Sequence, residues 1–541
     1  MTTPNFWGPD EDYHMMYVDT VAHEHRLIDP SRPLFSNEYS RTTQVTHFNE
    51  YGQGARLEYR GDPKGTIDEL ERLPASDRRG SMTGRGIGVV HAPFFYLAGG
   101  SVDAALGDKA MPTRMFWVRI VSGLFGVLAV YAAWLLASVI VATSAVALLA
   151  ALIVACQPML GYLSGLVNND PGVVATSTLA LALLAFLLRT PPRPAQGLWL
   201  GAAVALALGI KATALALLPL VALAYVGQGL VYGRWGTMLR SAAAACAVIL
   251  VLIGWWYIRS KILWGTFTGA VHGYHGPGQI APSPPVPAEG LTGTVTVLAK
   301  PSASLHDYYV WTREWLGTAY RTFWFHFLEF EAPRGTWLYY FPGVAAAAGA
   351  LAYAIYVVDR RRTLLDPTRA VLRQSLVVAA SSVTFVAPFL VEDLRHRADG
   401  VSFLTAAGRF MLPTYAPLVV CALIGALWIV RPRLQPVVLG VVAVFAGYFV
   451  WRVWESHYVG RYFGTTALPE AFHRMTYDRP EFVSAQLLWV VLVLAAAALV
   501  GAALTILRVA WGERPGGDDI VVSALAAETG DMVGKGAPEW R

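Results

Sequence analysis

Long stretches without a charged residue place the strongest constraint on how this chain can fold. The runs VSGLFGVLAVYAAWLLASVIVA at 121–142 and LLWVVLVLAAAALVGAALTIL at 487–507 contain no Asp, Glu, Lys or Arg. A helix of about 20 such residues crosses the apolar core of a bilayer. Only 15% of the 541 residues are charged, whereas a soluble protein has about a quarter. The sequence therefore predicts an all-α polytopic membrane protein.

Apolar segments of this kind recur along the chain. Eleven candidate spans lie at about 116–140, 144–165, 171–189, 197–211, 212–231, 240–258, 337–358, 374–392, 409–430, 434–451 and 485–508. The fourth and fifth are short, and they could form a broken pair. We therefore expect a bundle of about eleven transmembrane helices in two halves, 116–258 and 337–508.

Basic residues orient these spans. They are concentrated in loops that fall on one side of the membrane if the spans alternate in direction: Arg189 and Arg193, Arg234 and Arg240, the group from Arg360 to Arg373, and Arg431 with Arg433. The positive-inside rule makes that side cytoplasmic. Residues 1–115, a large first loop, and the aromatic-rich loop 259–336 are then extracytoplasmic, and 509–541 is expected to be a disordered cytoplasmic tail. We expect a multi-pass protein of the inner or plasma membrane of the cell.

The rest of the composition excludes several classes of function. The formal net charge of +5 lies mainly in short loops, so it indicates topology and no nucleic-acid binding. The three cysteines lie in apolar runs, which favours buried thiols. The sequence has no P-loop and no dinucleotide fingerprint, so no nucleotide cofactor is predicted. AHEHR at 22–26 is too short a pattern to assign a metal, and a requirement for a divalent ion stays open.

The first acidic cluster stands near the start of the chain. PDEDYH at 9–14 supplies Asp10, Glu11 and Asp12, together with His14. In the first turn of a helix these carboxylates would complement the helix dipole, which is a structural explanation. Alternatively, one of them faces a cavity at membrane level as a catalytic base, because ionisable groups at that depth tend to be functional. Both explanations stay open.

A second acid occurs in LVNNDPGVV. Asp170 follows Asn169 and precedes Pro171, which starts a span. Asn and Asp are preferred capping residues, so capping is again the structural explanation. By the predicted topology, however, this helix start lies on the same side of the membrane as Asp10 and Glu11. Two acidic clusters far apart in sequence could therefore form one site.

Three cations are predicted on that side too. Lys211 interrupts the apolar run of LGIKATAL, Arg259 follows Trp256 in GWWYIRS, and Arg409 opens a span in GRFMLPTY. Each also has a purely structural explanation, since long basic side chains near the ends of spans can extend their charged groups to the membrane–water interface. A guanidinium fork also matches phosphate oxygens in two-point contacts. Together the cations predict a phosphate site beside the acids.

The outer segment 306–340 is dense in Trp, Tyr, Phe and His. One interpretation is an interfacial aromatic belt that anchors the bundle at headgroup level. Another is a wall that stacks on sugar faces or on polyprenyl chains, because aromatic rings offer a large apolar area with a polar tip. The two interpretations are compatible.

The order of these motifs, with HAPFFYLAGG at 91–100 and VRIVSGLFG at 118–126, resembles the GT-C superfamily of membrane glycosyltransferases. The resemblance covers about residues 5–465 through short motifs. It is closest to a bacterial membrane family of unknown function, related to protein O-mannosyltransferase-like enzymes and lipid A aminoarabinose transferases. It implies a GT-C-like helical bundle and inverting transfer of a sugar from a polyprenyl-phosphate donor to an envelope glycan, lipid or protein acceptor outside the cytoplasm.

Carried onto this sequence, the resemblance implies specific roles. The implied catalytic residues are Asp10 or Glu11, and Asp170. The implied substrate-binding residues are His91, Tyr96, Lys211 and Arg409, the last within the motif Gly408-Arg409-Phe410. Asn169, Trp256 and Arg259 are further substrate-binding candidates beside them.

One departure from the superfamily concerns the start of the chain. In the superfamily a first transmembrane helix precedes the acidic motif, whereas nine residues precede Asp10 here. We expect a start codon assigned too far downstream, with an in-frame apolar stretch of about 20 residues upstream. A naturally truncated member is the alternative.

A different class of function is also compatible with a membrane bundle. The chain could be a non-catalytic transporter or flippase of lipid-linked sugars, or a scaffold in envelope polysaccharide assembly. Transporters commonly have internal repeats and charged residues in broken helices at the membrane midplane. This sequence has no clear repeat, and its candidate ionisable residues gather at the outer ends of spans. These features favour the transferase.

Overall fold

Every regular element in the described part of the chain is a helix, as the apolar runs predict. The computed structural model describes residues 3, 5–6, 8, 10–29, 36–45, 70, 72, 91–141, 143–268, 305–325, 336–366, 369–398, 408–460, 463–465, 467–476, 479–480 and 482–512. The predicted disordered tail lies outside these residues from position 513 onward.

Nine helices among the described residues are long and apolar enough to cross a membrane. They are α7 (Met111–Ile140), α10 (Asp170–Arg189), η1 with α12 (Ala212–Ala216, Leu217–Tyr232), α13 with η2 and α14 (Trp235–Ile249, Leu250–Gly254, Trp255–Trp264), α16 with η3 (Trp337–Arg360, Arg361–Thr363), α17 (Ala370–Ala398), η4 with α18 (Gly408–Thr414, Tyr415–Ile429), η5 with α19 and η6 (Pro432–Leu434, Gln435–Val453, Trp454–Val459), and α22 (Ala485–Gly512).

The predicted number of about eleven spans is not confirmed. α8 (Ser144–Ala155) and α9 (Pro158–Ser164) meet at 64°, and counting them as one span gives up to ten in the described residues. The bend occurs at Gln157, whose backbone is extended and whose side-chain oxygen accepts a hydrogen bond from the first turn of α9. α11 (Pro194–Ile210) has 17 residues and ends where the backbone becomes extended, so it falls short of a full span.

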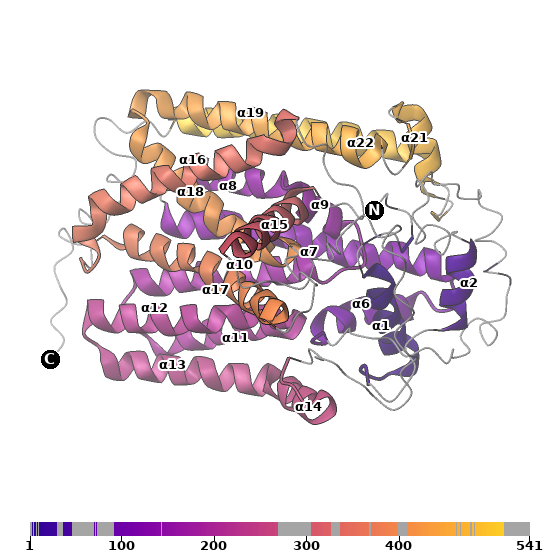
Figure 1. Cartoon of the computed structure of the whole chain (residues 1–541), viewed down its shortest axis with the longest axis horizontal. Helices are drawn as coiled ribbons and strands as arrows, with labels where there is room; N and C mark the ends of the chain where they lie inside the picture. The colour runs from indigo at the N-terminus through magenta and orange to yellow at the C-terminus, as the bar shows by residue number, and fades with distance from the viewer. Residues whose placement is uncertain are drawn as a thin grey trace.

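The spans lie side by side, with their connections at two opposite ends. Figure 1 shows the turn between α12 and α13 at one end, together with the neighbouring ends of α16 and α17. These connections contain basic residues, including Arg234, Arg361 and Arg362. The helices α1 (Glu11–Glu24), α2 (Asn37–Val45) and α6 (Phe94–Ala105) lie at the other end. The arrangement agrees with the alternation of spans on which the predicted topology depends.

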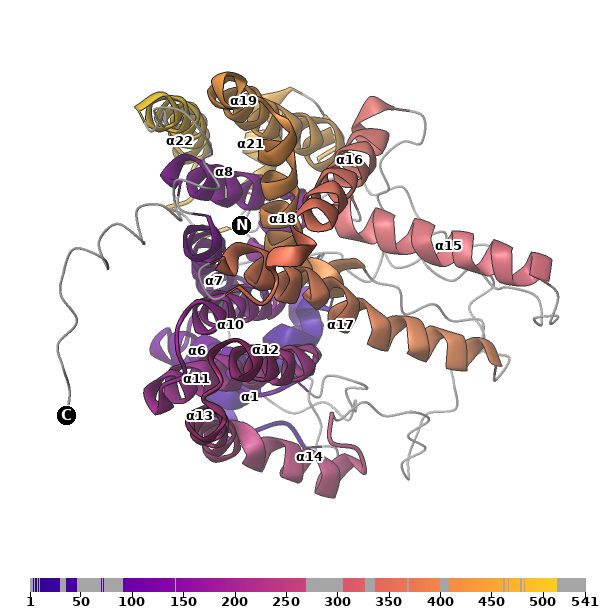
Figure 2. The ribbon, with the colours of Figure 1, turned by 90° about the vertical axis from the view of Figure 1, so that its left-hand side faces the viewer.

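One helix of the aromatic-rich segment runs across the bundle. α15 (Leu305–Trp324) lies across the direction of the spans and projects from them beside α17 (Figure 2). Its Trp311 and Trp315 pack against Met411 of η4, and Trp315 Nε1 donates to Asp393 Oδ2 at 2.7 Å. Part of the aromatic segment therefore supports η4. The belt and the sugar-binding wall stay predictions for its exposed rings, such as Tyr309.

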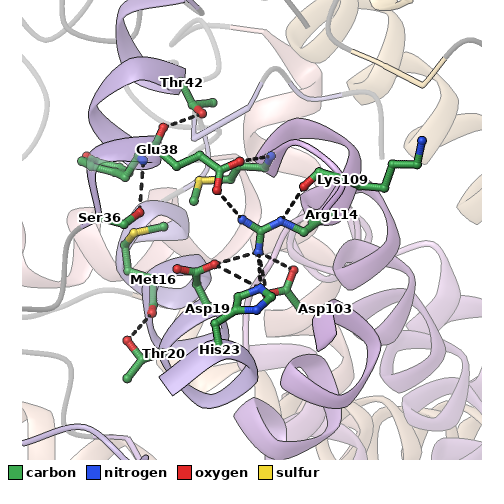
Figure 3. A network of polar contacts seen from close by, with 12 residues as sticks. Met16, Asp19, Thr20, His23, Ser36, Glu38, Thr42, Asp103, Lys109 and Arg114 are labelled. Carbon is green, nitrogen blue, oxygen red and sulfur yellow. Dashed lines mark hydrogen bonds and ion pairs between the residues drawn. The ribbon is translucent and has the colours of Figure 1, made fainter. Parts of the chain in front are cut away.

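A single guanidinium fastens the N-terminal helices to the bundle. Arg114, near the start of α7, donates from Nη1 to Asp19 of α1 at 2.7 Å and to Asp103 of α6 at 2.8 and 2.9 Å (Figure 3). Its Nη2 donates to Glu38 of α2 at 2.8 Å. Arg114 and Asp103 have no exposed surface. Three helices thus meet one buried charge, which holds them on α7.

We expect Arg114→Met to destabilise the protein strongly, because it leaves buried carboxylates without their cation. Loss of one partner from a buried ion pair costs about 3–5 kcal/mol. The measurement is the thermal midpoint of the purified protein in detergent. Lys109→Met is the control, since it removes a positive charge from an exposed side chain nearby. Equal midpoints for the two variants would contradict the role of Arg114.

The topology can be tested in a variant without its native cysteines. We expect Cys placed at Asp108, in the exposed turn between α6 and α7, to react with a membrane-impermeant maleimide in intact cells. Cys placed at Arg234, in the turn between α12 and α13, should react only after the cells are opened. The opposite labelling pattern would invert the orientation and remove the basis for an outer site.

Candidate functional site

Two acid–cation pairs bring together residues that the sequence predicts for one site. Lys211 Nζ is paired with Asp170 Oδ1, and Arg409 Nη2 is paired with Asp10 Oδ2. Both cations lie against the ring of Phe410, with Lys211 Nζ 4.5 Å and Arg409 Cζ 5.0 Å from the ring centroid. Residues as far apart in sequence as 399 positions therefore meet in one cluster.

Asp10 does not cap the helix that it precedes. It has left-handed backbone geometry with φ 58°, and its side chain makes no capping hydrogen bond to α1. This conformation is uncommon outside glycine, and Asp is among the residues that adopt it most readily. Its side chain is 51% exposed beside Arg409. Burial alone would raise the pKa of Asp10, but the positive charge of Arg409 and its neighbours lowers that pKa below its ordinary value. Asp10 is therefore an ionised, accessible carboxylate.

Glu11 has a different environment from its neighbour. Its Oε1 accepts from Arg119 Nε at 2.7 Å and from Val167 N at 2.9 Å, and its Oε2 accepts from Arg119 Nη2 at 2.8 Å. Both side chains have no exposed surface. Arg119 also donates to the backbone oxygen of Thr3 at 2.6 Å. This two-point pair joins the start of the chain to α7 and to the residues before α10, so its geometry is that of a structural contact.

The second acid is also released from capping. Asp170 is the first residue of α10, and its backbone N–H donates to Asn168 Oδ1 at 2.7 Å. Asn169 occupies the N-cap position and Asp170 follows it, so the carboxylate of Asp170 lies in the first turn of α10, where it pairs with Lys211. Lys211 itself stands at the break between α11 and η1, as its position between two short apolar runs predicts.

Asn169 presents an unsatisfied oxygen in this cluster. Its Nδ2 donates to the backbone oxygen of Ile210 at 3.3 Å and lies 3.4 Å from Tyr96 Oη. A carbonyl oxygen can only accept, so the contact with Ile210 fixes the orientation of the amide. Asn169 Oδ1 is then buried without a hydrogen-bond partner in the described residues. A buried acceptor without a donor is costly, and a ligand hydroxyl would satisfy it.

Neutral aromatic side chains line the cluster beside the ion pairs. His14 Nδ1 is 2.7 Å from Tyr96 Oη, and the ring of His91 stacks on His14 with centroids 5.5 Å apart. Tyr96 Oη accepts from Asn169 Nδ2 and shares a hydrogen bond with His14 Nδ1, and the direction of the second bond depends on the tautomer of the imidazole. Burial lowers the pKa of His14 to about 4 and that of His91 well below its ordinary value. Both rings are therefore neutral at physiological pH.

The glycine before Arg409 has a packing reason. A Cβ on Gly408 would lie 2.0 Å from the backbone oxygen of Ala319 and 2.6 Å from the backbone nitrogen of Phe323. The N–H of Gly408 donates to Thr322 Oγ1. Only a glycine lets η4 approach α15 this closely, and this contact sets the position from which Arg409 leaves the backbone.

Arg259 and Trp256 lie at a different position from the two ion pairs. Arg259 Nη2 donates to the backbone oxygen of Ile28, just after α1, at 2.7 Å. Its guanidinium lies over Trp256 and Trp264, with centroids at 5.1 and 5.4 Å. The structure therefore groups Lys211 with Arg409 and places Arg259 elsewhere on the same end of the bundle.

One cluster has the composition of a metal site. Asp19, His23 and Asp103 hold possible ligand atoms within 4.8 Å of one another. Arg114 Nη1 lies among them, 3.0 Å from His23 Nε2 and in hydrogen-bond contact with both carboxylates (Figure 3). The guanidinium supplies the positive charge at this place, so the ion network explains the close approach of these side chains.

Sequence reasoning missed the structural roles of Arg114 and Arg119. Both stand in PTRMFWVRI, inside a helix that is apolar enough to span a membrane. Charged residues in such segments are rare and usually paired, and this signal could have identified them. The role of His14 was also missed, although it stands four residues after Asp10 in the quoted motif.

Comparisons with known proteins find several solved structures that resemble this chain. Two similar solved structures are ArnT from Cupriavidus metallidurans in the apo state, with 16% identity, a TM-score of 0.40 and coverage of 91% of this chain and 77% of that chain, and the Archaeoglobus fulgidus oligosaccharyltransferase in the apo form, with 14% identity, a TM-score of 0.39 and coverage of 88% and 53%. ArnT bound to undecaprenyl phosphate also matches, with 16% identity, a TM-score of 0.38 and coverage of 82% and 68%.

A search of curated protein sequences finds no match. A family model described as "Predicted membrane protein (DUF2142)" matches residues 1–392. This span includes Asp10, Asp170 and Lys211, and it agrees with the expected relation to a membrane family of unknown function. The chain therefore belongs to the DUF2142 family of predicted membrane proteins.

Proposed function

We propose that the protein is a membrane glycosyltransferase that uses a polyprenyl-phosphate-linked sugar as donor, at the extracytoplasmic face of an inner or plasma membrane. The observation that carries this proposal is the placement of Lys211 and Arg409 against one ring, each beside its own carboxylate. Fixed cations favour the departure of a phosphate, and a nearby carboxylate can accept a proton from the attacking group.

The donor phosphate binds to Lys211 and Arg409. Without donor, the charges of these cations are balanced by Asp170 and Asp10. A phosphate offers Arg409 a two-point contact and competes with Asp10 for it. Negative charge grows on the phosphate as the glycosidic bond breaks, so the cations stabilise the transition state more than the bound donor.

Asp10 then acts as the general base. Its carboxylate takes the proton from an acceptor hydroxyl while the hydroxyl oxygen attacks the anomeric carbon. The bond from that carbon to the phosphate oxygen breaks, and polyprenyl phosphate leaves with the bonding electrons. Attack opposite to the phosphate inverts the anomeric configuration. Asp170 holds Lys211 in position throughout, and the acceptor is an envelope glycan, lipid or protein.

Neutral groups bind the transferred sugar in this proposal. Asn169 Oδ1 accepts a hydrogen bond from a sugar hydroxyl, and His14 Nε2 forms a hydrogen bond with another hydroxyl. His91 and Tyr96 form the wall beside them. Because these groups are uncharged, they discriminate by the pattern of donors and acceptors, and a missing hydroxyl leaves a buried polar atom unpaired.

The proposal is tested by incubating membranes that contain the protein with radiolabelled polyprenyl-phosphate sugars. Label should move into a glycan, lipid or protein fraction, and membranes that contain the Lys211→Met variant should not transfer it. Donor binding without transfer to any fraction would instead support the carrier or flippase function.

The roles of the two neighbouring acids can be separated. We expect Asp10→Asn to fold normally and to lose roughly 100-fold or more in turnover, the scale of general-base catalysis. Glu11→Gln should instead lower the thermal midpoint, because Arg119 loses its buried partner. Asp12→Asn is the matched control and should keep both properties. Parental turnover in Asp10→Asn would end the assignment of Asp10 as base.

The phosphate contact predicts a difference between two basic side chains. Arg409→Lys keeps the charge but loses the planar fork, so we expect about tenfold weaker binding of polyprenyl phosphate. Arg313→Lys is the control, since Arg313 is an exposed arginine on α15. Binding can be measured by the thermal shift that the lipid produces. Unchanged binding in both Arg409→Lys and Arg409→Ala would leave Arg409 as an interfacial anchor.

A further inference from the structure

Arg259 carries a charge for which the described residues supply no acid. Its Nη2 donates to the backbone oxygen of Ile28 at 2.7 Å, while its Nη1 is buried without a hydrogen-bond partner in the described residues. The indole rings of Trp256 and Trp264 make cation–π contacts with the guanidinium. An indole ring, however, offers no hydrogen-bond acceptor to Nη1. Buried charges are normally paired, so this edge of the guanidinium suits an anion.

A second polar group lies next to Arg259. Tyr17 has no exposed surface; its Oη lies near the backbone N–H of Ile28, and its own O–H is buried without an acceptor within the described residues. The charge of Arg259 acts on the Tyr17 hydroxyl, and both side chains lie beside Ile28. A phenolic O–H and a guanidinium N–H are both donors. Two donors and a positive charge, with no acid of the described chain among them, match a phosphate or a carboxylate.

This position is separate from the predicted donor phosphate but adjacent to the same site. The ring of Tyr17 stacks on Tyr96 with centroids 4.0 Å apart, and Tyr96 contacts His14 in the cluster around Asp10. α14 and the end of α1 lie together in both views (Figures 1 and 2). A ligand held at Arg259 would therefore lie on the other side of the two stacked tyrosines from Lys211 and Arg409.

We propose that Arg259 and Tyr17 form a second anion subsite, and that its ligand is an acidic glycan whose phosphate or carboxylate they bind. Its role as the acceptor subsite rests on the proposed glycosyltransferase function, whereas anion binding does not. With the donor phosphate on Lys211 and Arg409, an acidic acceptor anchored at Arg259 would present its hydroxyls to the cluster that contains Asp10. The acidic group of the acceptor would then be recognised away from the glycosidic bond that forms.

The test uses three sugars that differ only at carbon 6: glucose 6-phosphate, glucuronate and glucose. Binding is measured by saturation-transfer NMR on the purified full chain in a polyoxyethylene detergent, which contributes neither phosphate nor sugar. We expect glucose 6-phosphate and glucuronate to bind and glucose to bind at least tenfold more weakly. Arg259→Gln should weaken the two acidic sugars about 10- to 100-fold, the range expected when hydrogen bonds to a charged group are lost. It should leave glucose unchanged.

Matched variants separate this site from general charge effects. Lys261→Gln removes the same charge from the same helix, but Lys261 is exposed and its Nζ contacts the backbone oxygen of Gly265, so it should bind all three sugars as the parent does. Tyr17→Phe removes a single hydroxyl and should weaken the acidic sugars by a smaller factor. Arg259→Lys retains the charge and should keep partial binding, which identifies any loss caused by misfolding of Arg259→Gln.

Several results would overturn the proposal. These are equal binding of glucose and its acidic derivatives, an equal loss in Lys261→Gln and Arg259→Gln, and unchanged binding in Arg259→Gln. Inorganic phosphate that binds as tightly as glucose 6-phosphate would identify a bare anion site and overturn the glycan assignment. Polyprenyl phosphate binding is measured in parallel: its absence with intact sugar binding at Arg259 would end the proposed function and leave this subsite standing.

Discussion

The buried guanidinium groups of Arg114 and Arg119 are the interactions on which the rest of the structure depends. Both project from α7, and each binds carboxylates from segments that precede it in the chain. In a region of low dielectric such charges are tolerated only when their partners are in place, so the pairs hold the N-terminal helices in one position. Glu11 is fixed by Arg119, and Asp10 is the residue immediately before it. The location of the candidate base therefore follows from an ion pair in which it takes no part.

Two ion pairs at the start of the chain differ in burial, and this difference distinguishes a structural pair from a pair suited to catalysis. The Glu11–Arg119 pair has no exposed surface and satisfies both carboxylate oxygens. The Asp10–Arg409 pair has a half-exposed acid with unusual backbone geometry. A saturated buried pair cannot exchange its partner without a large penalty, whereas an exposed pair can release its cation to a phosphate. The general base and the transfer of a cation to the phosphate are accordingly assigned to the Asp10–Arg409 pair, whereas Lys211 keeps its buried partner Asp170.

Much of the candidate site could be predicted because topology alone restricts it. Asp170, Lys211 and Arg409 stand at the ends of apolar runs that alternate across the membrane, and Asp10 stands in the segment that precedes the first run, so all four were expected at one end of the bundle. Their meeting around Phe410 agrees with that expectation. Arg259 satisfies the same topological rule but packs on the end of α1. Two residues on the same side of the membrane need not be in contact, because contact depends on how the spans pack beside one another.

Some properties follow from the sequence by itself. Uncharged runs of sufficient length determine that the chain forms membrane-crossing helices, because backbone groups in lipid must be hydrogen-bonded within the segment, and the basic loops predict their direction. Other properties were decided only by the tertiary structure. Asp10 and Glu11 are adjacent acids in one motif, and no local pattern distinguishes them. Arg119, Val167 and Arg409 distinguish them, and these residues reach the motif only when helices far apart in sequence pack together, since the energy of a charge depends on its surroundings in space.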